Sequence, residues 1–318
     1  MMKKFAWIPL LALVFVACTK TETTTTERYL IFKFKFNDTI PRLNDTGAVV
    51  GIAPGNWAVS PSFNSVSSHF LELSPSDSTP LGKGTVLYLG AISGDSAIDF
   101  SKSVITKDGE TFLQVPLSSI PAGTYKWLRV SLSYQNYDVP YKLDSTFGNI
   151  SFYSVYNGTI ASFIGFKTHF NNDGYLIKNL RVTDVANQTK TQGYWGFETT
   201  VGSGGFTFPT KSYTGQAMTT TVVNPLFASS PVPQGSCVVT SRFNQIKNNK
   251  LGYVGYDSTV VSNLVITGKE TQSITVECNL STNKSFEWRD DNGDHFWQPL
   301  KGEQVIDMGI RGMKPIIK

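Results

Sequence analysis

The sequence has few of the residues and runs on which many function classes depend. It contains only 3 histidines and 3 cysteines, and charged residues make up 16% of the chain. None of the histidines lies in a nucleophile elbow or a His-x-x-x-His zinc pair. Long stretches of Ala, Leu, Glu and Lys are missing, and no helical pattern extends beyond a turn or two. These absences argue against a helical fold and against a histidine-activated nucleophile.

An excess of charge of one sign is also lacking. The chain has 28 basic and 24 acidic residues, and removal of a leader that contains Lys3 and Lys4 would leave 28 − 2 = 26 basic residues. A chain so close to neutral lacks the basic surface of a nucleic-acid-binding protein. We therefore expect no nucleic-acid partner.

One apolar run stands out at the N-terminus. Residues 5–16 follow two lysines and end just before Cys18, and Pro9 interrupts them. The run is shorter than the ~20 residues that a membrane-spanning helix needs. This pattern predicts a lipoprotein signal peptide over residues 1–17, with cleavage before Cys18 and acyl chains of the palmitate type on that residue. The mature protein would then be held at a membrane by lipid.

Two alternatives to a lipid anchor stay open. Phe15 stands where a leucine is usual three positions before a lipidated cysteine, so removal as an ordinary secretory peptide is one of them. An uncleaved anchor is the other. The threonine-rich residues 18–28 have nothing to pack with and are expected to form a flexible tether.

The rest of the chain consists of short runs in which apolar and polar residues alternate. Every second residue from Leu30 to Phe36 is apolar, which is the pattern of a strand with one buried face. Turns rich in Gly, Pro, Asn and Asp separate further runs. These runs cover residues 66–73, 85–89, 111–117, 125–134, 150–155, 160–166, 194–200, 238–243, 260–266, 274–280 and 305–308.

This pattern predicts an all-β fold. Without its leader the chain would keep 318 − 17 = 301 residues, which fits two domains. Two turns of similar sequence, Ile120–Tyr125 and Val232–Cys237, each precede a strand-like run. We expect two antiparallel β-sandwich-like domains, Ig-like or jelly-roll-like, over residues 29–145 and 146–318.

Two cysteines remain once Cys18 takes the lipid. Cys237 and Cys278 both lie in strand-like runs, and an oxidising compartment would allow them to join if the strands were neighbours. The sequence predicts this disulfide, with two buried free thiols as the alternative.

The sharpest local pattern is an acidic loop. Asp290, Asn292 and Asp294 occupy the first, third and fifth positions of a calcium-loop pattern, but its sixth position is His295 and its twelfth is Lys301. Two interpretations follow: a Ca²⁺ site, or a turn in which Asp and Asn side chains accept hydrogen bonds from their own backbone.

Tryptophans flank this loop and suggest binding. Trp288 and Trp297 stand on either side of it, and exposed Trp faces stack on sugar rings or anchor protein interfaces. We therefore expect a non-catalytic module that binds a glycan or a protein partner, with Trp288 and Trp297 as its ligand-binding aromatics. A carboxylate-dependent hydrolase and a structural subunit of an envelope complex remain alternatives.

Three features together carry a resemblance to a known group. The signal at Cys18, the turn at residues 120–125 and the stretch from Ser281 to Gly312 resemble outer-membrane lipoproteins of Bacteroidota. The resemblance implies an all-β protein held in the outer membrane by lipid and displayed in some cases at the cell surface. It carries over no catalytic residue.

Overall fold

The computed structural model describes residues 27–43, 48–93, 96–147, 149–183, 188–199, 201–203, 206–207, 211–216, 233, 235–246 and 259–318. Within these ranges the chain is built from β-strands, and three short 3-10 helices are its only helices. The all-β prediction is therefore confirmed. Cys18, the predicted signal peptide and most of the predicted tether lie outside the described residues.

A six-stranded sheet contains both the first and the last strand of the described chain, β1 and β25. Its order is β20-β19-β25-β22-β1-β6. In it β1 pairs parallel with β22 and antiparallel with β6, while β25 pairs antiparallel with β22. The strands are β1 (Tyr29–Asn37), β6 (Thr111–Pro116), β19 (Asn244–Ile246), β20 (Thr259–Val261), β22 (Ile274–Ser281) and β25 (Met313–Ile317).

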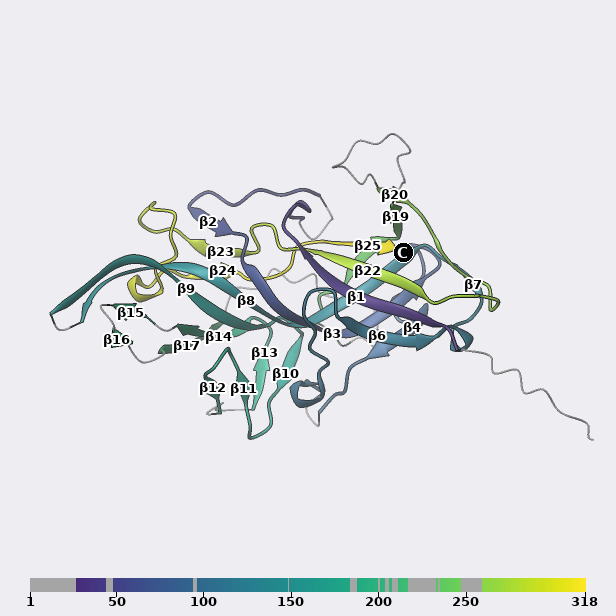
Figure 1. The fold of residues 1–318 in the computed structure, drawn as a ribbon, viewed down its shortest axis with the longest axis horizontal. Coiled ribbons are helices and arrows are strands. Elements are labelled where there is room, and N and C mark those ends of the chain that lie inside the picture. Colours follow the sequence, from purple (N-terminus) through teal and green to yellow (C-terminus); the bar gives the residue numbers. More distant parts are fainter. Residues whose placement is uncertain are drawn as a thin grey trace, which may run out of the picture.

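A seven-stranded sheet runs through the whole molecule. Its order is β17-β14-β9-β8-β3-β4, and β18 pairs with one end of β8. The strands are β3 (Ser62–Ser74), β4 (Thr85–Leu89), β8 (Trp127–Phe147), β9 (Ile150–Phe163), β14 (Tyr194–Thr199), β17 (Lys211–Gln216) and β18 (Val239–Arg242). The two longest, β8 and β9, form a hairpin that projects at one end of the elongated molecule (Figure 1).

Smaller ladders cover these sheets. They contain β2 (Asn56–Val59), β23 (Phe286–Arg289) and β24 (Val305–Asp307); β5 (Ile98–Asp99), β10 (Lys167–His169) and β13 (Thr189–Thr191); β7 (Gly123–Tyr125) and β21 (Leu264–Ile266); β11 (Tyr175–Leu176) and β12 (Arg181–Val182); and β15 (Gly202–Ser203) and β16 (Phe206–Thr207). The 3-10 helices are η1 (Phe100–Lys102), η2 (Leu117–Ser119) and η3 (Pro299–Lys301).

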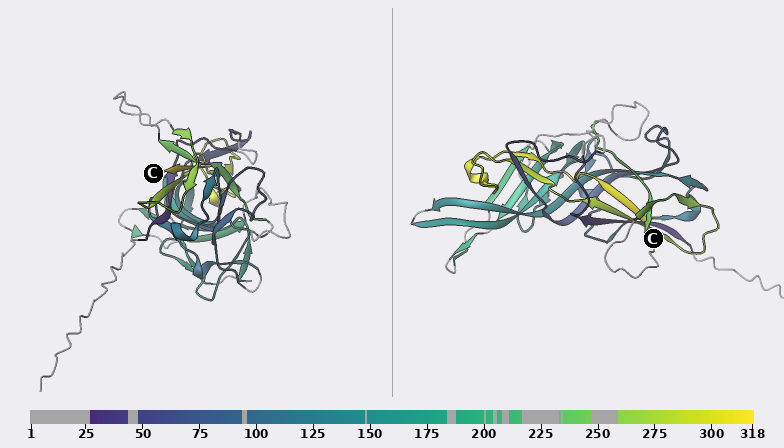
Figure 2. Two further views of the ribbon diagram at one scale, coloured as in Figure 1. Left: turned by 90° about the vertical axis from the view of Figure 1, so that its right-hand side faces the viewer. Right: turned by 90° about the horizontal axis from the view of Figure 1, so that it is seen from above.

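Three apolar clusters divide the interior. The first lies between the six-stranded sheet and the β3 and β8 part of the other sheet, and includes Phe32, Leu71 and Val276. The second lies nearer the tip of the hairpin, where inward residues of β8 pack under β23 and the loop that follows it. The third, around Phe163, is made by the segment after β9 packing against β8 and β9. Figure 2 shows that the hairpin end and the six-stranded end lie at opposite ends of the long axis.

The structure does not confirm a division into two sequential sandwiches. The predicted boundary at residues 145 and 146 falls within β8, inside a continuous ladder with β9. In addition, β1 pairs with β22, so the first and last thirds of the chain share a sheet and a core. Sequence pattern identifies strands by period, whereas pairing between residues about 240 positions apart leaves no local signal.

No helix in the described part of the chain is both long enough and apolar enough to cross a membrane.

Candidate binding surface

The two tryptophans predicted to bind a ligand are buried. Trp288 and Trp297 are each 1% exposed, so neither presents a ring face to solvent, and that prediction is wrong. Trp297 packs edge-to-face against Phe286 and Phe197, with ring centroids 4.9 and 5.1 Å apart. Both tryptophans belong to the second apolar cluster. Their large apolar side chains contribute much of the area that this cluster buries.

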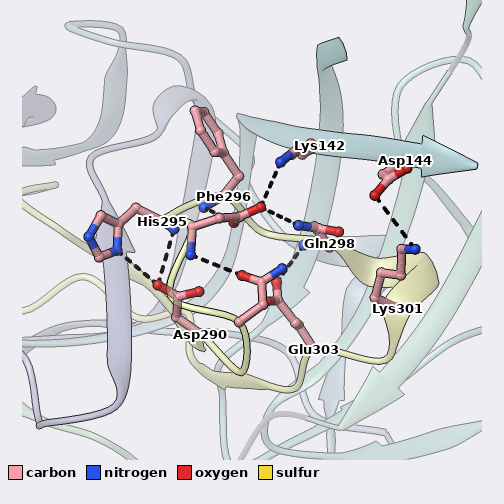
Figure 3. A network of polar contacts seen from close by, with 10 residues as sticks. Lys142, Asp144, Asp290, His295, Phe296, Gln298, Lys301 and Glu303 are labelled. Carbon is pink, nitrogen blue, oxygen red and sulfur yellow. Dashed lines mark hydrogen bonds and ion pairs between the residues drawn. The ribbon is translucent and has the colours of Figure 1, made fainter. Parts of the chain in front are cut away.

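The acidic loop between them is a hydrogen-bonded turn (Figure 3). Oδ2 of Asp290 accepts hydrogen bonds from the backbone N–H of His295 at 3.1 Å and from its Nδ1 at 2.9 Å. Oδ1 of Asn292 accepts from the N–H of Asp294 at 2.9 Å, and Oδ1 of Asp294 from the N–H of Phe296 at 3.0 Å. The loop side chains therefore satisfy the backbone of their own turn, which is the second of the two interpretations drawn from the sequence.

A lysine from β8 supplies the positive charge of this loop. Nζ of Lys142 lies 2.7 Å from Oδ2 of Asp294, and this hydrogen bond raises the pKa of Lys142. Burial alone would raise the pKa of Asp294, but hydrogen bonds from Lys142 and the Phe296 N–H together hold it below its ordinary value. Next along the hairpin, Lys301 pairs with Asp144 at 3.6 Å. These two ion pairs fasten the loop and η3 to β8.

Two carboxylate oxygens beside the loop have no hydrogen-bond partner. They are Oδ1 of Asp290 and Oε1 of Glu303, and both are buried. Burial, with smaller contributions from the Asp290 and Asp294 carboxylates, raises the pKa of Glu303. Among the described residues, no group of three or more His, Cys, Asp or Glu side chains is arranged to hold a metal ion. The geometry thus favours the turn over a calcium shell at Asp290, Asn292 and Asp294.

Calcium is accordingly expected to leave the stability of the protein unchanged. Lys142 already neutralises Asp294, and Oδ1 of Asn292 and Oδ2 of Asp290 accept backbone hydrogen bonds. Thermal unfolding should give the same melting temperature in millimolar calcium and in EDTA. A calcium site would instead add about 2.7 kcal/mol of stability when free calcium is a hundred times its Kd, and such a rise would restore the calcium interpretation.

Two exposed aromatic side chains, those of Trp57 and Phe296, lie at the acidic loop. The Trp57 indole stacks on the His295 imidazole, with ring centroids 3.7 Å apart and an angle of 16° between the planes. Trp57 is 39% exposed and Phe296 is 41% exposed. Nζ of Lys142 lies 5.7 Å from the centroid of the Phe296 ring. We call the residues Trp57, Lys142, His295, Phe296 and Leu300 the loop surface.

The position of Trp57 is set by backbone pairing. Trp57 lies opposite Trp288 in the ladder between β2 and β23. The N–H of Asp290 donates to the carbonyl of Gly55 at 3.0 Å, which ties the acidic loop to the start of β2. His295 has a φ of 66°, a left-handed conformation that is uncommon outside glycine and is held here by its two bonds to Asp290. The ladder with β23 therefore fixes Trp57, and the bonds to Asp290 fix His295.

A buried ion cluster lies behind this surface. The Arg42 guanidinium contacts the carboxylate of Glu287 and lies 3.3 Å from that of Asp307, and all three side chains are buried or nearly so. Asp307 also accepts from Nε of Arg311 at 2.6 Å. Nδ2 of Asn56 donates to Oε1 of Glu287 at 2.6 Å, so the residue before Trp57 is fixed by the same cluster.

The predicted disulfide between Cys237 and Cys278 is not formed in the structure. Cys278 is a free thiol with no exposed surface, inside the first core, and burial raises its pKa. Cys237 precedes β18, which pairs with β8, whereas Cys278 lies on β22, which pairs with β1 and β25. The prediction required neighbouring strands, and these two strands belong to different sheets.

Comparisons give this surface no known counterpart. No protein-family model matches the chain, and neither a curated protein nor a solved structure matches it. Any function must therefore be argued from the chain itself.

Proposed function

We propose that this chain is a lipid-anchored protein of the cell envelope that binds a carbohydrate, without catalysis, on the loop surface. The observation that carries the proposal is the half-exposed Trp57 ring, which is stacked on His295 and held by the ladder between β2 and β23 and by a buried ion cluster. A rigid aromatic ring loses little conformational entropy on binding and offers a flat apolar face to a sugar ring.

The surroundings of Trp57 supply the polar groups that orient a sugar. Binding sites combine apolar rings with a few well-placed polar groups. Here Phe296 adds a second exposed ring, while Lys142, Asp144 and Lys301 form ion pairs at the rim that can exchange hydrogen bonds with hydroxyl groups. The mixture of both charges fits a neutral or weakly charged glycan better than a strongly charged one.

The state of the carboxylates supports binding over hydrolysis. A glycosidase needs one carboxylic acid and one free carboxylate on either side of the scissile bond. At the loop surface, Asp144 is paired with Lys301 and Asp294 with Lys142. The unpartnered oxygens of Asp290 and Glu303 are buried, so neither faces a sugar bound at the surface. His69, a possible base elsewhere, is fully buried, and burial lowers its pKa to about 3.

A glycan array followed by a hydrolysis screen on the bound glycans tests the proposal. We expect specific binding and no turnover. Turnover that disappears on substitution of a single Asp or Glu would favour the hydrolase alternative. Absence of any glycan signal, together with co-purification of another envelope protein, would favour the structural-subunit alternative.

The lipid anchor is tested separately, at Cys18. Mass spectrometry of the N-terminal peptide of the native protein should show cleavage before Cys18 and acyl chains on it. The Cys18→Ala protein should move to the soluble fraction. An unmodified Cys18 or an intact Met1 would contradict this part of the proposal, and protease shaving of intact cells then addresses whether the protein is displayed outward.

A further inference from the structure

The acidic loop contains an asparagine followed by a glycine, at Asn292 and Gly293. An asparagine in this setting can react with its own backbone, because a following glycine has no Cβ to shield its nitrogen from the side-chain amide. The chain has a second such pair, Asn157 and Gly158. The same dipeptide therefore stands at two places in the fold, and the structure distinguishes them.

Asn292 and Gly293 lie in an exposed bend that belongs to no strand. Gly293 has a φ of 71°, and a Cβ built on it would meet nothing within 4 Å beyond its chain neighbours, so the residue stands in open space. The N–H of Asp294 donates to Oδ1 of Asn292 at 2.9 Å. This bond folds the side chain back along its own backbone, toward the Gly293 nitrogen. It also polarises the side-chain carbonyl and stabilises negative charge that develops on its oxygen.

Asn157 is exposed as well, but a sheet holds its backbone. It lies in β9 and pairs with Pro140 of β8, and Gly158 and Thr159 continue the same ladder. Gly158 is buried against Phe197, so closely that a Cβ on this glycine would clash with the ring. Bringing the Asn157 amide carbon to the Gly158 nitrogen requires the hairpin to open locally, which costs free energy.

We propose that Asn292 is a site of spontaneous deamidation in the native protein. The Gly293 nitrogen gives its proton to water or hydroxide and attacks Cγ of Asn292. The bond from Cγ to Nδ2 breaks, and the side-chain nitrogen takes up a proton and leaves as ammonia. The product is a cyclic imide. Water then adds to either carbonyl of the imide and opens the ring, which gives aspartate or isoaspartate at position 292.

Both products change the acidic loop. Each adds a negative charge next to the carboxylates already there. Isoaspartate also lengthens the backbone by one carbon after position 292, which displaces Asp294 and His295 relative to Lys142 and Trp57. The ion pair that fastens the loop and the stacked pair of the loop surface both depend on that spacing. The reaction needs only the chain itself and water, so the inference stands without the proposed function.

Peptide mapping by mass spectrometry tests the proposal on the folded, full-length protein, incubated at mildly alkaline pH. Conversion of the amide to an acid raises the mass of the peptide that contains it. We expect Asn292 to convert at least about tenfold faster than Asn157, because only Asn157 must wait for the ladder to open. Conversion should be slower at mildly acidic pH, since the Gly293 nitrogen must lose its proton to attack.

Two controls separate the effect of the fold from that of the dipeptide. In protein unfolded by urea, Asn157 and Asn292 should convert at similar rates, because each is then a flexible pair with its glycine. Gly293→Ala should slow conversion of Asn292 about tenfold, because the added methyl group crowds the attacking nitrogen. The positive φ at this position disfavours alanine, so the melting temperature of the variant is measured to show that it folds.

Three results would overturn the proposal. The first is equal conversion of Asn157 and Asn292 in the folded protein. The second is an intact Asn292 in the folded protein at a time when the unfolded protein has converted. The third is a folded Gly293→Ala protein in which Asn292 converts as fast as in the wild type.

Discussion

Replacing Arg42 with alanine is expected to lower the free energy of unfolding by about 3–5 kcal/mol, which is the usual cost of removing one partner from a buried ion pair. The substitution leaves the carboxylate of Glu287 buried, with only the amide of Asn56 as a side-chain partner. Asp307 keeps Arg311, so Glu287 carries most of the loss. Urea unfolding of the two proteins measures the difference.

An exposed ion pair provides the control. Lys35 and Asp108 are 2.6 Å apart, but both side chains are exposed to water. Lys35→Ala should therefore cost only about 0–1 kcal/mol. If Arg42→Ala cost no more than Lys35→Ala, the buried cluster would not be holding β2 and β23 together, and the argument for a rigid Trp57 would lose its support.

Replacing Trp297 with alanine is also expected to cost about 3–5 kcal/mol, because it empties the centre of the second core. The exposed Trp57 is the matched control, and Trp57→Ala should change stability by only about 0.5 kcal/mol. Unfolding curves of both variants decide between a core and a surface role. If both substitutions lowered the free energy of unfolding by the same small amount, Trp297 would be exposed to solvent, as the sequence analysis predicted.

The sequence predicts the positions of several strands well. The runs at residues 85–89, 111–117 and 274–280 correspond closely to β4, β6 and β22, because a strand with one buried face has a period of two that is visible locally. The acidic loop was also located correctly, since Asp, Asn and Gly in close succession make turns through their own side chains.

Pairing between distant segments is what the sequence does not reveal. Trp57 and His295 are separated by more than two hundred residues, yet they stack because β2 pairs with β23. The same pairing buries Trp288, so proximity to the loop in sequence pointed to the wrong tryptophans. A local signal was present at Trp57, which follows the turn Pro54-Gly55-Asn56, but nothing in that turn indicates which strand it will meet.

The measurement that tests the central claim most directly is the affinity of Trp57→Ala for a glycan that the wild-type protein binds. We expect the affinity to fall at least about tenfold, since stacking on a rigid aromatic anchor dominates such sites, while the melting temperature stays near that of the wild type. Leu89→Ala, which removes an exposed apolar side chain from β4, should bind as the wild type does. An unchanged affinity in folded Trp57→Ala protein would show that the loop surface is not where the ligand binds.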